Sequence, residues 1–549
     1  MDLKLELQKI IKGDVIDDIE TIKKYSHDAS LLEVAPKLVV YPKDKDDVKN
    51  IVKFVNENKL DHPELSITGR SAGSDMTGGP LSESIILDFT KYFKKDEIDF
   101  ENLEVTVEPG VFYRDFEAIA LPKYISYPSY PASKQLAAFG GMVMNNSAGE
   151  RTLRYGQTRD YCLELKMVLS DGNEYAIKPL TLEETKQKIA QGDFEGDLYK
   201  KTYELVEKNY EEIKNAEPKV HKNSSGYALW KILNKEKNIF DLTQLFVGSQ
   251  GTLGILTEAK VRLIKEKPFR KMIVAFFKSW DDLPKVVNEV LPYDPESMET
   301  FDDATLKLGI KFMPEIAKKA HSSFVKFALQ FLPEVWIGIK MMRLPKLIVM
   351  IELTEDSQNE IDRKTKEIVT KLGRFGGIQL RVLKNELDEE KYWVMRRESF
   401  NLLRQHVHGK RTAPFVEDFC ILPEKMPEFL PKLLKILKDN KIKANIAGHA
   451  GDGNYHIIPL MDLTKESERA KIVPVSEKVF ALIKEYGGTI TAEHNDGIIR
   501  TPYLEEMFGE KIYSLFVDVK NIFDPQNIFN PGKKVGGSKE YINEHISKK

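Results

Sequence analysis

The sequence predicts an α+β protein of two or three domains, and three observations carry this prediction. Its 549 residues exceed what one hydrophobic core usually serves. Between residues 36 and 268, apolar runs typical of short strands alternate with helical patterns. From about Phe269 the pattern starts again, because strand-then-helix units begin at 271–277 and at 347–353. This repeat predicts an antiparallel sheet covered by helices on one face.

The elements before residue 268 can be assigned in order. The first 35 residues place Leu and Ile at helical spacing among charges, so we expect a helical segment over 1–35. Residues 37–42 indicate a strand, 46–55 an amphipathic helix and 65–68 a second strand, which together form a β-α-β unit. Further strands are expected at 84–88, 104–111 and 163–172, with a helix from about Tyr113.

The composition excludes several classes of protein. Lys and Arg number 82 and Asp and Glu 85, so the net charge of −3 gives no electrostatic reason to expect nucleic-acid binding. Cys162 and Cys420 are isolated, which argues against a disulfide framework, an iron–sulfur cluster or a cysteine zinc site. No apolar signal region begins the chain and no run reaches the ~18 apolar residues of a membrane span. We therefore expect a cytoplasmic protein.

Two glycine-rich stretches indicate a site for an extended anionic ligand. Residues 68–79 contain four glycines together with Ser71, Ser74 and Thr77, so backbone N–H groups and hydroxyls can converge on a pyrophosphate. Residues 127–149 contain, in this order, a turn, a run of small residues, an amide pair and a glycine. Neither a Walker A motif nor G-x-G-x-x-G is present, which argues against a triphosphatase or a Rossmann site. A surface loop between strands is the alternative interpretation of the first stretch.

With a third motif at 245–258, these stretches closely resemble the FAD-binding domain of the vanillyl-alcohol oxidase/PCMH flavoprotein family, over roughly residues 25 to 265. The resemblance implies a PCMH-type domain of two subdomains with FAD between them. Ser74 stands where relatives with covalent flavin have a histidine, so we expect dissociable FAD. The resemblance implies these cofactor-binding residues: Arg70, Ser71, Ala72, Gly73, Ser74, Asp75, Thr77, Pro131, Gly140, Gly141, Asn145, Ser147, Ala148, Tyr155, Gly156, Gly251, Gly254, Ile255 and Asn530.

A separate motif, at residues 447–458, indicates a metal site. If Asp452 and Gly453 form a two-residue hairpin turn, residue 449 pairs with 456, and His449 and His456 face each other about 5 Å apart between Cβ atoms. Two imidazoles at that separation can bind one metal, and Glu493 can supply a third, oxygen ligand. A cross-strand histidine pair without metal is the alternative. His494 follows Glu493 and is a candidate base.

Residues 269–533 are similar to the C-terminal FAD-linked oxidase domain, and the two motifs resemble those of the D-2-hydroxyacid dehydrogenases of that family. The resemblance implies that His449, His456 and Glu493 hold zinc, manganese or iron, that His494 is the base, and that Asn454 hydrogen-bonds substrate. Asp452 is expected to form the turn. Where the family commonly has E-H-G-x-G, this chain has Asn495 and Asp496 before Gly497, so Asp496 adds a carboxylate.

The segment 392–398 matches the family's W-x-x-R motif, whose arginine binds the substrate carboxylate. A guanidinium fork binds a carboxylate bidentately, so Arg396 is the expected ligand and Arg397 the alternate, and either also fits a solvated helix charge. Phe400 stands where hydroxyglutarate enzymes have threonine, which favours D-lactate over glycolate or D-2-hydroxyglutarate. We expect His494 to remove the hydroxyl proton while hydride passes to flavin N5.

Two other functions fit the same motifs: a non-catalytic or partner-dependent flavin subunit of a glycolate oxidase-like complex, and a transferase like alkyl-dihydroxyacetonephosphate synthase. A separate electron acceptor is required, either a quinone, a cytochrome, an electron-transfer flavoprotein or oxygen. A homodimer is also expected.

A basic, apolar insertion covers residues 311–346, with seven Lys or Arg against two Glu. It fits peripheral contact with the inner face of a membrane. It also fits a helical pair that roofs the active site with its lysines in water, and Pro333 and Pro345 favour this second interpretation because they break a long helix. The expected domains are 1–35 (helical), 36–268 (FAD-binding), 269–490 (substrate/cap), 491–533 (returning to the flavin) and 534–549 (a solvated tail).

Overall fold

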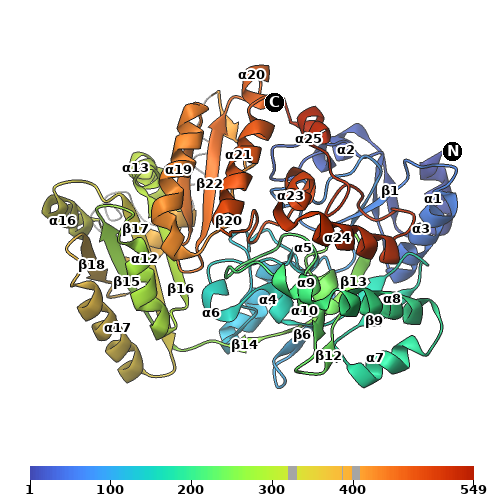
Figure 1. The fold of residues 1–549 in the computed structure, drawn as a ribbon, viewed down its shortest axis with the longest axis horizontal. Coiled ribbons are helices and arrows are strands. Elements are labelled where there is room, and N and C mark those ends of the chain that lie inside the picture. Colours follow the sequence, from blue (N-terminus) through green and yellow to red (C-terminus); the bar gives the residue numbers. More distant parts are fainter. Residues whose placement is uncertain (320–330, 386–387, 398–408, 549) are drawn as a thin grey trace.

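A computed structural model describes residues 1–319, 331–385, 388–397 and 409–548. Figure 1 shows a cap sheet with its helices on one side of the molecule and the N-terminal region, residues 1–268, on the other. Helices α24 (Glu510–Phe523) and α25 (Lys539–His545) lie over the N-terminal region, so the chain crosses to the cap and comes back.

The first subdomain is a four-stranded sheet in the order β1 (Asp14–Ile16), β2 (Leu38–Tyr41), β4 (Ile85–Asp88), β3 (Ile67–Arg70). Strands β2 and β3 both run parallel to β4, as the β-α-β pattern predicts. Strand β1 pairs antiparallel with β2. The helices expected in residues 1–35 are α1 (Leu3–Ile10) and α2 (Ile19–Tyr25), and the edge strand between them was not predicted.

Helix α3 (Lys45–Asn58) shows why this unit forms where the sequence predicts it. The Asp44 carboxylate caps its N-terminus by accepting hydrogen bonds from two backbone N–H groups of the first turn. Its buried positions Val48, Ile51, Val52 and Val55 follow helical spacing and pack into the core with the first sheet. The chain then enters β3, whose end opens directly into the first glycine-rich loop.

The second subdomain is an antiparallel sheet in the order β5-β6-β13-β8-β9. Helix α5 (Phe139–Asn145) packs against this sheet and carries the second glycine-rich stretch. The strand bounds are β5 (Asp96–Asp99), β6 (Glu104–Val107), β13 (Ile255–Arg262), β8 (Cys162–Val168) and β9 (Glu174–Ile177).

The cap domain contains an eight-stranded sheet in the order β18-β15-β17-β16-β21-β22-β19, with β20 also paired to β22. Every pairing in it is antiparallel, which confirms the predicted sheet type. The strand bounds are β15 (Phe269–Phe277), β16 (Ser297–Asp302), β17 (Leu347–Glu355), β18 (Ile378–Val382), β19 (Arg411–Thr412), β20 (Phe419–Cys420), β21 (Lys443–His449) and β22 (Asn454–Met461).

Helices cover both faces of this sheet, whereas the sequence pattern predicts helices on one face. Helices α12 (Leu283–Val290), α17 (Gln358–Leu372), α19 (Met426–Asp439) and α21 (Ile472–Glu485) share one core with the sheet. On the opposite face, Ala317 of α14 (Met313–Lys319) and Met341 of α16 (Leu332–Met341) pack against Phe301 and Ile348. That second face also carries the histidines of the metal motif.

The C-terminal segment lies against the N-terminal region. Phe529 forms a parallel bridge with Ile67, so this segment extends the first sheet beside β3. The expectation of a solvated tail over 534–549 is wrong. Lys534 is fully buried, and Ile546 pairs with Leu32 of the N-terminal segment.

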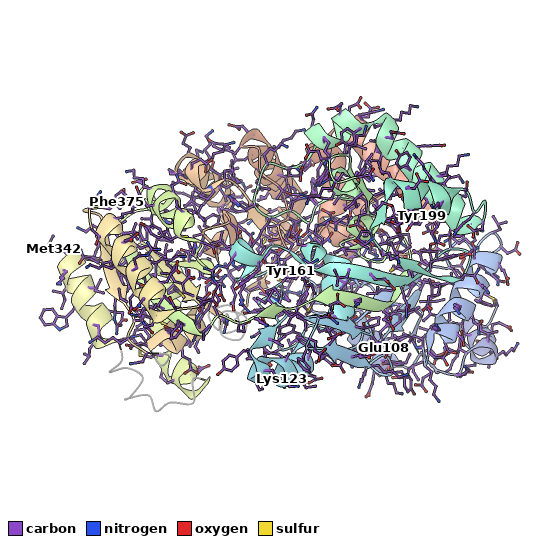
Figure 2. All side chains as sticks on the ribbon, turned by 90° about the horizontal axis from the view of Figure 1, so that it is seen from below. Glu108, Lys123, Tyr161, Tyr199, Met342 and Phe375 are labelled. Atoms are coloured by element: carbon purple, nitrogen blue, oxygen red, sulfur yellow. The ribbon has the colours of Figure 1, made fainter. Side chains whose placement is uncertain are left out.

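The insertion 311–346 falls partly on residues 320–330, outside the described residues. Helix α16 begins at Leu332 with Pro333 in its first turn and ends before Met342, whose φ of 56° closes the helix. Figure 2 shows Met342 at the end of the cap domain far from Tyr199 in the N-terminal region. No described residue of the insertion lines the cavity of the candidate site, so the roofing interpretation finds no support in the described part of the chain.

Candidate active site

The two halves of the molecule enclose a cavity of about 390 Å³. The glycine-rich loops and α5 form one end, while Arg396, Thr412, Glu417, His456, Glu493 and His494 from the C-terminal half reach the other. Fifteen of the nineteen predicted cofactor residues line it: Arg70, Ser71, Ala72, Gly73, Ser74, Asp75, Pro131, Gly140, Gly141, Asn145, Ser147, Ala148, Gly251, Gly254 and Ile255.

The other four predicted cofactor residues, Thr77, Tyr155, Gly156 and Asn530, do not line the cavity. Asn530 lies behind it, where its Nδ2 donates to the carbonyl oxygens of Gly79 at 2.9 Å and Gln250 at 2.7 Å. It therefore holds two cavity loops together. The Thr77 hydroxyl donates to Asp75 within the first loop. The aromatic ring of Tyr155 stacks on Arg151, and Gly156 ends the short helix that carries this ring.

The histidine hairpin has a different register from the predicted one. His449 pairs with Asn454 and Ala447 with His456, so residues 450–453 form a four-residue turn rather than a two-residue one. Within this turn, the Asp452 carboxylate forms an ion pair with the buried Lys222 at 3.0 Å. His449 and His456 still share a face, because their positions in the ladder differ by an even number of residues. Their ring centroids lie 5.3 Å apart.

His449, His456 and Glu493 form the predicted cluster. Glu493 Oε1 lies 2.7 Å from His449 Nε2 and 4.0 Å from His456 Nε2, and all three side chains are buried. Burial alone lowers the pKa of His449, but the charges of Glu299 and Glu493 outweigh it and raise the pKa to about 9. Burial lowers the pKa of His456.

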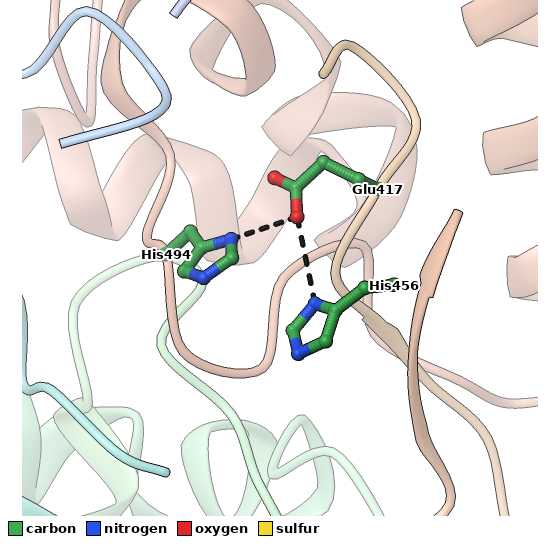
Figure 3. A group of neighbouring side chains, drawn as sticks. All are labelled: Glu417, His456 and His494. Atoms are coloured by element: carbon green, nitrogen blue, oxygen red, sulfur yellow. Dashed lines mark hydrogen bonds and ion pairs between the residues drawn. The ribbon is translucent and has the colours of Figure 1, made fainter. Parts of the chain in front are cut away.

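His494 lies beside this cluster and is partly open to the cavity. Its ring is stacked on that of His456 at 5.2 Å between centroids, and its Nδ1 lies 2.7 Å from Glu417 Oε2. Burial lowers the pKa of His494, but Glu417 and Asp418 outweigh it and raise the pKa to about 10. Figure 3 shows Glu417 between the two imidazoles.

Arg396 and Arg397 occupy distinct environments. Arg396 lines the cavity, and its Nη2 lies 2.9 Å from Glu299, which in turn contacts His449 Nδ1 at 2.5 Å. Arg397 forms an ion pair with Glu150 at 2.5 Å and lies over the Trp393 ring. The structure therefore favours Arg396 over its alternate.

Asn454 does not occupy the predicted position at the substrate. It is fully buried, it does not line the cavity, and its Nδ2 donates to Asp418 at 3.1 Å and to the Phe419 carbonyl at 3.0 Å. The expected contact with substrate is therefore corrected: Asn454 fastens the β20 end to the histidine hairpin. Asp496 also turns away from the cavity, toward Lys534 at 2.8 Å.

Sequence reasoning missed four charged residues of the site. Glu417, Asp418, Glu299 and Lys222 come from three separate segments, and no spacing rule links them to the histidine motif. Asp418 accepts hydrogen bonds from the backbone N–H groups of Ala492, Glu493 and His494, so it shapes the loop that carries Glu493 and His494. The only signal in the sequence was the adjacent acidic pair Glu417-Asp418, which follows an apolar run.

Comparison with known families agrees with this geometry. A family described as "FAD linked oxidases, C-terminal domain" matches residues 266–534, and one described as "FAD binding domain" matches residues 36–177. The chain belongs to the FAD-linked oxidase family. The recognition from sequence motifs is thereby confirmed, as is the two-part fold.

Several relatives of this FAD-linked oxidase are oxidoreductases of hydroxy acids. It is 27% identical to D-2-hydroxyglutarate dehydrogenase of Pseudomonas putida over 95% of this chain, yet it spans only 50% of that relative's length. It is 26% identical to the glycolate oxidase subunit GlcD of Bacillus subtilis, covering 97% of this chain and 96% of GlcD. It is also 26% identical to D-lactate dehydrogenase of Archaeoglobus fulgidus, covering 96% and 98%.

Solved structures confirm the fold alone. The FAD-linked oxidase superposes on 4-ethylphenol oxidase from Gulosibacter chungangensis with a TM-score of 0.69 at 15% identity, over 98% of this chain and 97% of that one. It superposes on alkyldihydroxyacetonephosphate synthase with a TM-score of 0.64 at 14% identity, over 97% and 86%.

The cavity fits a flavin cofactor. At Gly141 and Gly251 an added Cβ would meet no protein atom closer than 3.8 Å, although both glycines line the cavity. Such a Cβ would point into the space that the ligand needs, and Gly251 has a φ of +68° that few other residues adopt. The cavity volume lies in the range of small-molecule sites.

The histidine cluster fits a divalent metal. Two imidazoles and one carboxylate are a usual donor set of catalytic zinc, and such donors lie about 3.3 Å apart around a tetrahedral ion. The candidate donor atoms all lie within 4.8 Å of one another. Lys222 stands 3.2 Å from Glu493 and, with His449, holds the pKa of Glu493 well below its usual range despite burial. Glu493 is therefore ionised, as a metal ligand must be, and its present partners are Lys222 and His449.

Proposed function

We propose that this FAD-linked oxidase oxidises a D-2-hydroxy acid to the 2-oxo acid, with D-lactate as the favoured substrate. One observation carries the proposal. The predicted FAD-binding loops form one end of the cavity, and at the other end lie a guanidinium, a histidine and a cluster of side chains suited to bind a metal. Relatives named for D-2-hydroxyglutarate, glycolate and D-lactate support the same reaction class.

The side chains of this protein have defined tasks in that reaction. Arg396 binds the substrate carboxylate, and its contact with Glu299 fixes the direction of the guanidinium. His494 takes the hydroxyl proton at Nε2 in its neutral form, because Glu417 occupies its Nδ1. A divalent cation beside the ring favours this form, because it lowers the raised pKa of His494. When bound, FAD supplies the hydride acceptor, and a divalent metal polarises the hydroxyl and lowers the pKa of groups near it.

The substrate end of the cavity supports a monocarboxylate. Among the described lining residues there, Arg396 is the one with a fixed positive charge, while Arg70 lies in the glycine-rich loop at the opposite end. A second substrate carboxylate would need a second partner, because an unpaired buried charge is costly. Phe400, which entered the prediction from sequence, lies outside the described residues.

A partner-dependent flavin subunit is the second candidate function. Its support is that the first-named relative is twice as long as this chain, while another is named as a subunit. In that case electrons and part of the activity depend on a second polypeptide. Isolated protein would then bind FAD and yet not be reduced by any hydroxy acid.

The deciding experiment is an anaerobic absorbance spectrum of purified protein before and after addition of D-lactate, with L-lactate as the control. We expect the flavin band to bleach with the D form alone, and to bleach far more slowly after metal removal by a chelator. Acid denaturation should release the flavin, because Ser74 offers no covalent attachment site. A band unchanged by lactate, glycolate and D-2-hydroxyglutarate would favour the subunit.

A further inference from the structure

Glu417 lies at the centre of the site without a role in the proposed chemistry so far. Its side chain is fully buried, and one oxygen, Oε1, lies 2.6 Å from Nη2 of the buried Arg500. The other oxygen, Oε2, lies 2.7 Å from Nδ1 of His494 and 3.6 Å from Nδ1 of His456 (Figure 3). Oε2 of Glu417 therefore faces Nδ1 of both His494 and His456.

We infer that Glu417 is a positioning residue that fixes the tautomers of both histidines, the predicted metal ligand His456 and the base His494. This inference rests on the proposed function. A carboxylate only accepts hydrogen bonds, so Nδ1 of His494, at 2.7 Å, must carry the proton. Nδ1 of His456 faces the same oxygen at 3.6 Å, which is an ion-pair distance rather than a hydrogen bond, and the negative charge favours the proton on that nitrogen as well. Each Nε2 is then left with its lone pair, which His456 needs to bind a metal and His494 needs to accept a proton.

The surroundings of Glu417 suit this task. Arg500 Nη2 contacts both the carboxylate and the Glu417 backbone carbonyl, which prevents rotation of the side chain. The Arg500 contacts thus hold the carboxylate in place as an acceptor, and Arg500 itself does not line the cavity.

A competing interpretation is that Glu417, His456 and His494 are themselves the metal ligands, because their donor atoms also lie close together. The geometry favours the set with His449. Each carboxylate has a cationic neighbour, but both oxygens of Glu417 are engaged, Oε1 by Arg500 and Oε2 by His494. In Glu493, by contrast, Lys222 and His449 both contact Oε1. On the opposite side of the His456 ring, Nε2 faces Glu493 at 4.0 Å, and Glu493 has the His449 Nε2 at 2.7 Å.

The test compares Glu417→Gln with Glu352→Gln in the FAD-loaded protein. The first substitution keeps the side-chain volume, but the single carbonyl oxygen of the amide cannot hold both Nδ1 protons as a charged acceptor. Glu352 is a buried carboxyl of the cap sheet that does not line the cavity, so its variant is the matched control. Zinc affinity is measured by competition with a chromophoric chelator, and flavin reduction by D-lactate in single-turnover kinetics.

We expect Glu417→Gln to weaken zinc binding 10- to 100-fold and to slow flavin reduction by about 100-fold or more, with the KM for D-lactate changed much less. Glu352→Gln should change none of these. Equal zinc affinity in Glu417→Gln and wild type would overturn the shared role. Zinc binding that survives in His449→Ala and vanishes in Glu417→Gln would overturn it as well, since Glu417 would then be a ligand.

A second measurement needs no substitution and covers the case of a variant that does not fold. Nitrogen-15 NMR of histidine-labelled, zinc- and FAD-loaded protein distinguishes the two tautomers of each ring. We expect His456 and His494 to be protonated at Nδ1, and an Nε2–H neutral ring at either position would refute the inference. Neither the NMR nor the zinc result depends on turnover, so a failure of the proposed reaction remains distinguishable from a failure of this inference.

Discussion

At the scale of single residues, two buried carboxyl groups of the cap sheet have pKa values shifted in opposite directions. Burial and the nearby charge of Glu296 raise the pKa of Glu352 to about 8, and Arg270 only partly offsets this. Burial also raises the pKa of Glu355 on the same strand, but Lys364 and Lys267 outweigh it and lower the pKa. One strand thus carries a carboxyl that folds protonated and a carboxylate that folds ionised.

These opposite shifts predict opposite pH dependences. The folded protein keeps the Glu352 proton while the unfolded chain loses it from about pH 4.5 upward, so stability falls as pH rises from 4.5 to about 8. Glu352→Gln removes this fall, and we expect a gain on the order of 4 kcal/mol at pH 9 relative to pH 5. Thermal unfolding of both proteins at the two pH values measures it.

Glu355→Gln is the control for that experiment. Because the Glu355 carboxylate is stabilised in the folded state, its contribution is present above the unfolded pKa and is lost as pH falls. Its Gln variant should therefore lose stability at pH 9 and approach wild type near pH 4. A Glu352→Gln curve parallel to wild type at all pH values would contradict the assignment.

The site also shows which functional residues can be predicted from the sequence. His449, His456 and Glu493 could be predicted because two short motifs hold them, and a change of register by an even step leaves side chains on the same face. Glu417, Glu299 and Lys222 could not, since they meet the motifs only through the packing of sheet and loops. Asn454 was misassigned for the same reason: its neighbour Asp418 comes from another segment of the chain.

At the scale of elements, strands were predictable where apolar runs were continuous, as in β15 and β17, both largely buried. The short strands β1, β19 and β20 were not predictable, because two or three residues are too few to show the alternation of apolar and polar side chains that marks a strand. Helix α3 was predictable from its cap and its buried stripe. The second covered face of the cap sheet was not, because α14 and α16 pack on it through isolated residues.

Helix α16 is the element whose surface is unusual. Among the described residues, 15 large hydrophobic side chains are exposed, and five of these lie within 332–344. Trp336 is 66% exposed, and Lys340 and Arg343 flank it on the exposed surface. An apolar patch with basic neighbours binds an anionic lipid surface through burial and charge together. No described helix is long and apolar enough to cross a bilayer.

We therefore predict that the protein binds vesicles containing phosphatidylserine more strongly than pure phosphatidylcholine vesicles. The double variant Trp336→Ser/Ile339→Ser should lower the partition constant at least tenfold, since about 1.4 kcal/mol of apolar burial corresponds to that factor. Co-sedimentation measures it, with Leu60→Ser as the control, because Leu60 is 85% exposed in the N-terminal region. Equal sedimentation of all three proteins would rule out this surface, and concentration-dependent dimers would assign it to a second copy.

At the scale of the whole molecule, the C-terminal tail contacts both the N-terminal region and the loop that follows His494. Lys534 Nζ donates to the carbonyl oxygens of Ser224 at 3.0 Å and Gly226 at 2.9 Å, and forms an ion pair with Asp496 at 2.8 Å. It thereby joins the N-terminal region, the loop after the base His494 and the tail. The residue that departs from the family motif, Asp496, serves this junction.

This junction yields the last prediction. Lys534→Met leaves the buried Asp496 carboxylate without its cation, so we expect a loss of about 3–5 kcal/mol and earlier FAD release on heating. Lys534→Met/Asp496→Asn should recover part of that loss, because no unpaired charge remains and the amide oxygen at position 496 still accepts a hydrogen bond from the Gly226 backbone N–H. Denaturant unfolding and flavin fluorescence follow both quantities. A loss of zinc binding in Asp496→Asn with unchanged stability would instead make Asp496 a metal ligand, contrary to the structure, in which its carboxylate faces the tail and not the cavity.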